Sequence, residues 1–355
     1  MFLWLLTVCI GLAHATSLPP SLVVQNQASD ARRYQAWSAR QTVVTHPENY
    51  RYLAEVHRDL GALSAERPGV LRPFEIGRTV QDRPIWAFRI RDPARPVIRR
   101  VLVFAGIHPI EWISTETAVT IAEELARHPV SGVEVVVVPV LNIDRRLQVE
   151  DDLRGHRNVY RRTNINGVDL NRDWATHREA KAVWRHIIPG FYETSPGPVS
   201  QPESQALEGL LQEGFDVAIS LHSFGGYIYH PWAGRWQRPR DWETYRRLGD
   251  VMAKAQGHRA YQVRQLSRWG FFFRAQGAEI DHIYKRYGTL AFLIELSRSG
   301  QHLLRPGSFG HIFRWYNPGD PAPAVSKGLS AVRALVGTLA QEGEAAPKRV
   351  PFSED

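Results

Sequence analysis

The segment 106–112, with the sequence GIHPIEW, constrains the fold of this chain more than any other feature. The apolar run at 101–105 precedes it and predicts a buried strand, and a helix-like spacing of apolar residues follows it as far as Pro129. His108 and Glu111 should therefore lie at the carboxyl end of a strand, where open α/β sheets bind ligands. An imidazole and a carboxylate three residues apart can bind one metal ion, although this motif alone also fits a surface His–Glu pair.

Strand and helix patterns alternate along most of the chain. The order of strand 101–106, helix 114–128 and strand 133–142 predicts a right-handed crossover between parallel strands. We expect residues 143–202 to be mostly irregular. The remaining patterns predict strands at 71–76, 84–90, 215–221 and 287–296, and helices at 47–65, 203–214, 242–255 and 329–339.

The two ends of the chain differ in composition from the middle. Residues 1–15 contain a short apolar core and the small-residue site Ala13-His14-Ala15, which predicts a secretory signal peptide, with an uncleaved anchor as the alternative. Residues 16–45 are interpreted as an N-terminal extension and 343–355 as a disordered tail. The only cysteine, Cys9, lies in the signal segment, so the mature protein should have neither a disulfide nor a thiol nucleophile.

The net charge of +8 is compatible with nucleic acid, anionic membranes or anionic polymers. The sequence contains no block of basic residues and no recognisable nucleic-acid motif, so we expect no nucleic-acid partner. A cell-envelope polymer is the favoured counterpart, and a charge that serves only solubility is the alternative. No second stretch is apolar enough to span a membrane once the signal is removed.

Two more polar side chains occur near the ends of predicted strands. His222 follows the apolar strand 215–221, and Glu295 lies in the apolar run 287–296. A buried carboxylate is costly without a partner, so Glu295 is either paired with a buried arginine or used as a general base beside a metal-bound water.

These segments together resemble the M14 zinc carboxypeptidases, the carboxypeptidase A and B superfamily. The resemblance covers roughly residues 45–340 and rests on ordered motifs at 106–114, 160–163, 167–172, 220–223 and 280–296. It implies a single α/β domain at 46–342, with a mixed, mostly parallel sheet of about eight strands flanked by helices.

The resemblance also implies roles for individual residues. His108, Glu111 and His222 match the ligands of one zinc ion, and Glu295 matches the general base. Arg161 matches the arginine that stabilises the oxyanion, with its neighbour Arg162 as the alternative.

Three further positions are implied to support the zinc ligands and the substrate. Asp169 matches a carboxylate that orients His108. Asn171 and Arg172 match the pair that binds the terminal carboxylate of the substrate, a task that suits the planar guanidinium of arginine.

The chain also departs from the family pattern. Phe273 stands where a substrate-capping tyrosine is usual, and Phe224 likewise replaces an aromatic hydroxyl. Ile110 stands where the digestive enzymes carry an arginine. Ile280 matches the base of the side-chain pocket, and its apolar side chain argues against a preference for Lys or Arg.

We therefore expect a secreted or periplasmic zinc metallocarboxypeptidase acting on peptides. A cell-wall (murein) peptide amidase of the same fold is the first alternative, and an inactive binding protein on this fold is the second. The sequence does not indicate an oligomeric state.

Overall fold

The computed structural model describes residues 20–41, 49–179, 195–270, 273–298 and 310–343. The predicted signal peptide and all of the predicted tail except Gly343 lie outside these ranges. Among the helices of the described part, none combines the length and apolar character that crossing a membrane requires.

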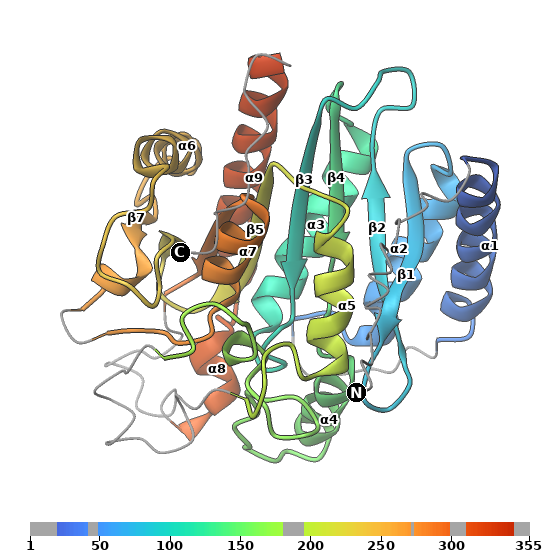
Figure 1. Ribbon diagram of the computed structural model, residues 1–355. Coiled ribbons are helices and arrows are strands. Elements are labelled where there is room, and N and C mark those ends of the chain that lie inside the picture. The colour runs from blue at the N-terminus through green and yellow to red at the C-terminus, as the bar shows by residue number, and fades with distance from the viewer. Residues whose placement is uncertain (1–19, 42–48, 180–194, 271–272, 299–309, 344–355) are drawn as a thin grey trace, which may run out of the picture.

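Eight strands form one mixed sheet in the order β1-β2-β4-β3-β5-β8-β6-β7 (Figure 1). Neighbouring strands are parallel for β4-β3, β3-β5, β5-β8 and β6-β7, and antiparallel for β1-β2, β2-β4 and β8-β6. The strands are β1 (Leu71–Arg78), β2 (Pro84–Ile90), β3 (Arg99–Ala105), β4 (Val133–Val138), β5 (Val217–Ser223), β6 (Tyr227–His230), β7 (Gln262–Gln265) and β8 (Leu290–Leu296). The predicted α/β fold with a helix-flanked sheet of eight strands is confirmed.

The central strands are buried along their whole length because helices cover the sheet. Every residue of β4 and β5 is buried, and their sequences are rich in Val, Ile and Leu. Helices α3 and α9 pack against each other and against the sheet, while α5 packs on β1 and α7 on β8 (Figure 1). The helices are α1 (Pro20–Ser38), α2 (Leu53–Glu66), α3 (Trp112–Arg127), α4 (Ile143–Arg154), α5 (Pro202–Leu211), α6 (Trp242–Ala255), α7 (Glu279–Tyr287), α8 (Ile312–Tyr316) and α9 (Ala322–Glu342).

Most described residues of the segment 143–202 form neither helix nor strand, as predicted. Helix α4, at the start of this segment, was not predicted. Its buried positions include Asp144, Arg146, Glu150 and Asp152, which have partners inside the protein. Because these positions are polar, the apolar repeat that normally indicates a helix is missing here. The short elements β6, β7, α7 and α8 were also not predicted.

The predicted N-terminal extension contains helix α1, which packs against α2 and β1. Tyr34 on this helix has no exposed surface, and its ring meets those of Trp86 and Phe88 edge-on, with ring centroids 4.9 and 5.2 Å apart. This part of the extension therefore lies against the sheet.

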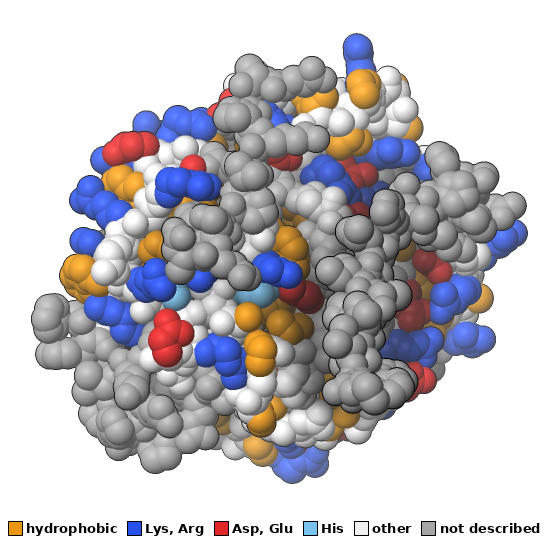
Figure 2. Space-filling view, viewed as in Figure 1, with side chains coloured by type: hydrophobic (Ala, Val, Ile, Leu, Met, Phe, Trp, Pro, Cys, Tyr) orange, Lys and Arg blue, Asp and Glu red, His pale blue; other side chains and the backbone are white. Residues whose placement is uncertain are grey.

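Positive charge is distributed over the surface. Figure 2 shows Lys and Arg side chains scattered across the visible face, interspersed with acidic ones. The net charge of +8 is thus not gathered into one patch on this face.

Burial keeps the imidazole of His57 neutral beneath α1. The Tyr34 hydroxyl lies 3.3 Å from His57 Nδ1 and donates to the His57 carbonyl at 2.9 Å. His57 is 1% exposed, and its burial lowers the pKa to about 3. The unfolded chain has no such burial, so its His57 binds a proton at a much higher pH than the folded protein does.

Acidification should therefore destabilise the fold through His57. Below the ordinary pKa of 6.5 only the unfolded chain gains this proton. The free energy of unfolding therefore decreases as the pH is lowered from about 6.5 to about 3. The contribution is up to about 1.4 kcal/mol per pH unit. In urea unfolding between about pH 4 and 6, His57→Gln should flatten the pH dependence by up to this amount. Replacement of the exposed His128 by Gln is the control, and an equal slope in both variants contradicts the prediction.

Candidate metal centre

Parallel pairing brings three strand ends together at one edge of the sheet. His108 and Glu111 follow β3, His222 lies in β5, and Glu295 lies in β8 directly opposite His222 in the register. The turn after β3 requires Gly106, which has a φ of +67°, because a Cβ there would lie 3.0 Å from the Cα of Val140.

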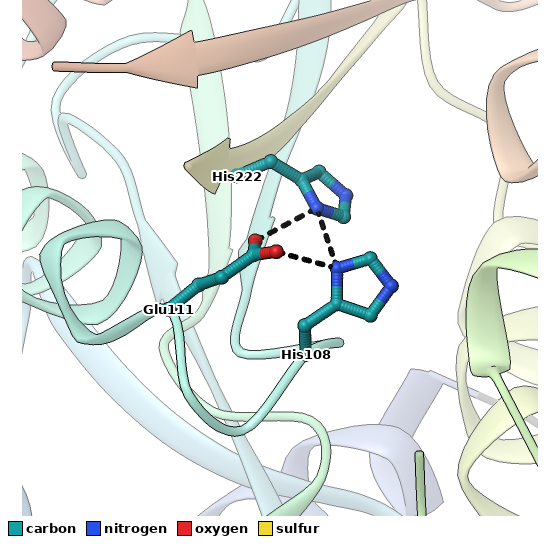
Figure 3. A group of neighbouring side chains, drawn as sticks. All are labelled: His108, Glu111 and His222. Atoms are coloured by element: carbon teal, nitrogen blue, oxygen red, sulfur yellow. Dashed lines mark hydrogen bonds and ion pairs between the residues drawn. The ribbon is translucent and has the colours of Figure 1, made fainter. Parts of the chain in front are cut away.

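Three side chains point toward one another at this edge (Figure 3). His108 Nδ1 lies 2.8 Å from Glu111 Oε1, and His222 Nδ1 lies 3.0 Å from Glu111 Oε2. The two Nδ1 atoms are 3.1 Å apart, and one ligand atom from each residue lies within 4.8 Å of the others. All three residues are buried. Two imidazole nitrogens and a carboxylate form the donor set of a catalytic zinc site that leaves a position open for water.

A carboxylate lies behind each imidazole. His108 Nε2 is 3.0 Å from Asp169 Oδ1, the contact that the sequence resemblance implies. His222 Nε2 is 3.0 Å from Glu279 Oε1, a contact that the sequence analysis missed. In the sequence, the acidic residues Glu279 and Asp281 on either side of the apolar Ile280 could have indicated this contact. They lie at the start of a helix that was not predicted.

The charges of these groups fit a dication. Four carboxylates lie around the two imidazoles, those of Glu111, Asp169, Glu279 and Glu295. The positive charges of Arg162 and Arg172 lie close enough to these carboxylates to favour their ionised forms. Carboxylates thus outnumber guanidinium groups around the imidazoles, which favours the binding of a cation. The nearby carboxylates outweigh the effect of burial on His222 and raise its pKa to about 10, which shows that the site favours positive charge.

Glu295 is the fourth carboxylate and is not bound to either imidazole. Burial and the negative charge of Glu111 raise the pKa of Glu295 to about 8. Its Oε2 has no accessible surface and no hydrogen-bond partner within the described ranges. A carboxylate so placed can accept a proton near neutral pH.

The arginine at the metal centre is Arg162 and not the predicted Arg161. Arg161 binds Asp152 and Gln148 on α4, which holds its guanidinium there. Arg162 Nε donates to Asp169 Oδ2 at 2.7 Å, and its Nη1 is 4.0 Å from Glu111 Oε1. Asp169 and Glu111 thus hold the guanidinium group of Arg162 at the candidate metal centre.

The predicted carboxylate-binding pair lies between Asp169 and Glu279. Asp169 caps the short 3-10 helix Leu170–Arg172 by accepting the backbone N–H of Asn171 at 2.9 Å. Asn171 Oδ1 accepts the backbone N–H of Glu279 at 3.1 Å, and Arg172 is buried beside it. The structure therefore brings both predicted residues to the metal centre.

The positions that depart from the family pattern have their own contacts. Phe273 is half-buried and packs on Trp269, and Ile280 is fully buried in α7 next to Glu279. Phe224 packs edge-on against Tyr316, whose hydroxyl bonds that of Tyr160 at 3.2 Å. Ile110 is buried in the turn between His108 and Glu111.

Comparison with known proteins shows similarity to one protein family. The profile of peptidase M14, zinc carboxypeptidase, matches residues 56–312. Mouse carboxypeptidase A2 is 24% identical over 272 residues, which cover 71% of this chain and 64% of the relative. Mouse carboxypeptidase A6 is 23% identical over 269 residues, covering 71% of this chain and 61% of the relative. The chain thus spans less than two thirds of the length of these relatives.

Solved structures show the same fold. Carboxypeptidase A from Helicoverpa armigera has a TM-score of 0.67 at 19% identity, covering 92% of this chain and 82% of that chain. Bovine thrombin-activatable fibrinolysis inhibitor has a TM-score of 0.66 at 20% identity, covering 83% of this chain and 98% of that chain.

The geometry predicts one Zn²⁺ per chain. His222→Ala removes one of the three candidate ligands, and we expect stoichiometric zinc, measured by elemental analysis after dialysis, to be lost. His282 is the matched control, since it is buried and bound to Glu208 at 2.9 Å. Zinc retained at full stoichiometry by His222→Ala would refute the ligand assignment.

Proposed function

We propose, because this chain belongs to the peptidase M14 family of zinc carboxypeptidases, that it is a zinc-dependent metallocarboxypeptidase that hydrolyses C-terminal peptide bonds. The observation that carries the proposal is the register of β5 and β8, which sets Glu295 directly beside His222. A ligand set and a general base on adjacent strand ends are what metal-assisted hydrolysis requires.

The proposal assigns His108, Glu111 and His222 as the residues that hold Zn²⁺. The donor set and the carboxylate behind each imidazole support this assignment. When bound, Zn²⁺ supplies Lewis acidity, which lowers the pKa of a water molecule and polarises a carbonyl group.

Glu295 acts as the general base and then as the general acid. Its carboxylate accepts the proton of the attacking water and passes it to the departing amine. Positive charge at the centre favours the ionised form of Glu295, whereas burial and Glu111 favour the protonated form. These opposing influences hold its pKa in the range in which it can take up and release a proton.

Two arginines stabilise two different negative charges of the substrate. Arg162, held by Asp169 beside Glu111, stabilises the negative charge that develops on the carbonyl oxygen. Arg172, with Asn171, binds the terminal carboxylate of the peptide, because a guanidinium fork matches a carboxylate. Asn171 Oδ1 is used by Glu279, which leaves the amide Nδ2 group as its donor.

The proposal extends to processing and location. We propose that residues 1–15 are a cleaved signal peptide, that 46–342 is the catalytic domain, and that the enzyme is secreted or periplasmic. The apolar core and small-residue site near Ala13 support the first of these. Peptides, including cell-wall peptides, are the proposed substrates.

Digestion of matched peptides tests the function. Peptides with free and amidated C-termini are incubated with the zinc-loaded enzyme, the chelator-treated enzyme and the re-loaded enzyme, and the products are identified by mass. We expect zinc-dependent release of the last residue from free-acid peptides only. Equal cleavage of both forms would refute the carboxypeptidase and favour the amidase or an endopeptidase.

Glu295→Gln should retain zinc and lose turnover by several orders of magnitude, because an amide cannot accept the proton. The measurements are zinc content and kcat on a free-acid peptide. Glu208→Gln serves as control, since this glutamate lies on α5 and binds His282. Turnover close to that of the wild type would assign the base to another residue.

Arg172→Ala should lower kcat/KM for free-acid peptides by about 10²–10³-fold, because the substrate carboxylate would be left buried without its bidentate partner. Zinc content should not change. Arg99→Ala is the matched control, since Arg99 is a buried arginine at the opposite end of β3. An equal loss of activity in both variants would indicate general destabilisation instead of a lost carboxylate contact.

A further inference from the structure

Both imidazoles of the metal centre are bound from behind in the same way. His108 Nε2 meets Asp169 Oδ1 at 3.0 Å, and His222 Nε2 meets Glu279 Oε1 at 3.0 Å. In each case the Nδ1 atom on the other side of the ring faces the common point between the ligands. The sequence motifs account for Asp169 only.

We propose that Glu279 is a positioning residue that orients His222 for the metal and raises its donor strength. This inference rests on the proposed metal-binding role of His222. A hydrogen bond from Nε2–H to a carboxylate fixes the tautomer in which Nδ1 carries the lone pair. The negative charge of the carboxylate also makes that lone pair more basic.

The backbone around Glu279 is fixed to the loop that carries the other site residues. The Glu279 N–H donates to Asn171 Oδ1 at 3.1 Å. Gly277, with a φ of +57°, lies so close to that loop that a Cβ would be 2.7 Å from the carbonyl oxygen of Arg172. Two residues later, Asp281 accepts the backbone N–H groups of Ala233 and Gly234 at 2.6 and 2.9 Å.

These contacts hold the first turn of α7 from two sides, so the carboxylate of Glu279 has a defined position.

The surroundings of the Glu279 carboxylate also indicate that it stabilises a nearby positive charge. Glu279 has no exposed surface, and its Oε2 has no hydrogen-bond partner in the described part of the chain. A buried carboxylate with one hydrogen bond is costly unless positive charge lies nearby.

A purely structural role is the competing explanation, in which Glu279 forms an ordinary buried pair with His222 and supports the fold. The two roles differ in what the loss of Glu279 changes. A structural role alone predicts that any weaker Zn²⁺ binding is accounted for by a loss of metal-free stability, whereas a positioning role predicts weaker Zn²⁺ binding and a changed Co²⁺ spectrum in a protein that remains folded.

Two variants separate charge from hydrogen bonding. Glu279→Gln keeps an oxygen that can accept the proton of Nε2 but removes the charge, and Glu279→Leu removes both. Glu208→Gln is the matched control, because Glu208 binds the buried His282 at 2.9 Å in the same geometry and contacts no ligand of the centre. The full chain is used throughout.

Three measurements are made on each variant: Zn²⁺ affinity by competition with a chromophoric chelator, the absorption spectrum of the Co²⁺-substituted protein, and urea unfolding without metal. We expect Zn²⁺ binding to weaken about 10-fold in Glu279→Gln and about 100-fold in Glu279→Leu. The Co²⁺ bands should shift in both, while both variants remain folded without metal under the conditions of the titration.

Other outcomes overturn the inference. Unchanged Zn²⁺ affinity and an unchanged Co²⁺ spectrum in Glu279→Leu would do so, as would a loss of metal-free stability in Glu279→Gln that accounts for the weaker binding. The metal-binding role of His222, on which the inference rests, fails separately: it fails if the wild type itself binds no Zn²⁺ or if His222→Ala binds it as well as the wild type.

Discussion

Negative charge concentrated inside a folded protein is the constraint on which this structure depends. The carboxylates of Glu111, Asp169, Glu279 and Glu295 lie around two imidazoles at the carboxyl edge of the sheet, and they outnumber the guanidinium groups of Arg162 and Arg172. Burial of an uncompensated carboxylate is unfavourable, so further positive charge stabilises a site of this composition. A bound dication would supply that charge at the point where these elements converge.

Much of this arrangement could be predicted because it follows from strand patterning. Strands β3, β5 and β8 are continuous apolar runs, and the polar residues that end them stand out for that reason. Parallel strands place their carboxyl ends at one edge, which is why His108, His222 and Glu295 could be assigned to one site. Predicting the fold and the three candidate ligands required no more than these patterns and the family motifs.

The remainder could not be predicted because polar contacts decide it. Arg161 and Arg162 are adjacent in an irregular segment, and only the positions of Asp152 and Asp169 determine which guanidinium reaches the metal centre. Helix α4 buries charged side chains, so it lacks the apolar repeat of a helix. Glu279 directly precedes the motif that begins at Ile280 but is not part of it, and its proposed role depends on its contact with His222.

The same buried polar contacts hold the turn that carries Glu111. Trp112 Nε1 donates to the Pro109 carbonyl at 3.0 Å, and the guanidinium of Arg146 on α4 lies 3.5 Å from the centroid of the Trp112 ring. From the other side, the Asn317 amide donates to the Ile110 carbonyl at 2.7 Å and accepts the Ile113 N–H at 2.9 Å. These bonds fix the backbone on both sides of Glu111. The turn can therefore hold a carboxylate against two imidazoles, because its geometry is set by neighbours that lie outside the candidate ligand set.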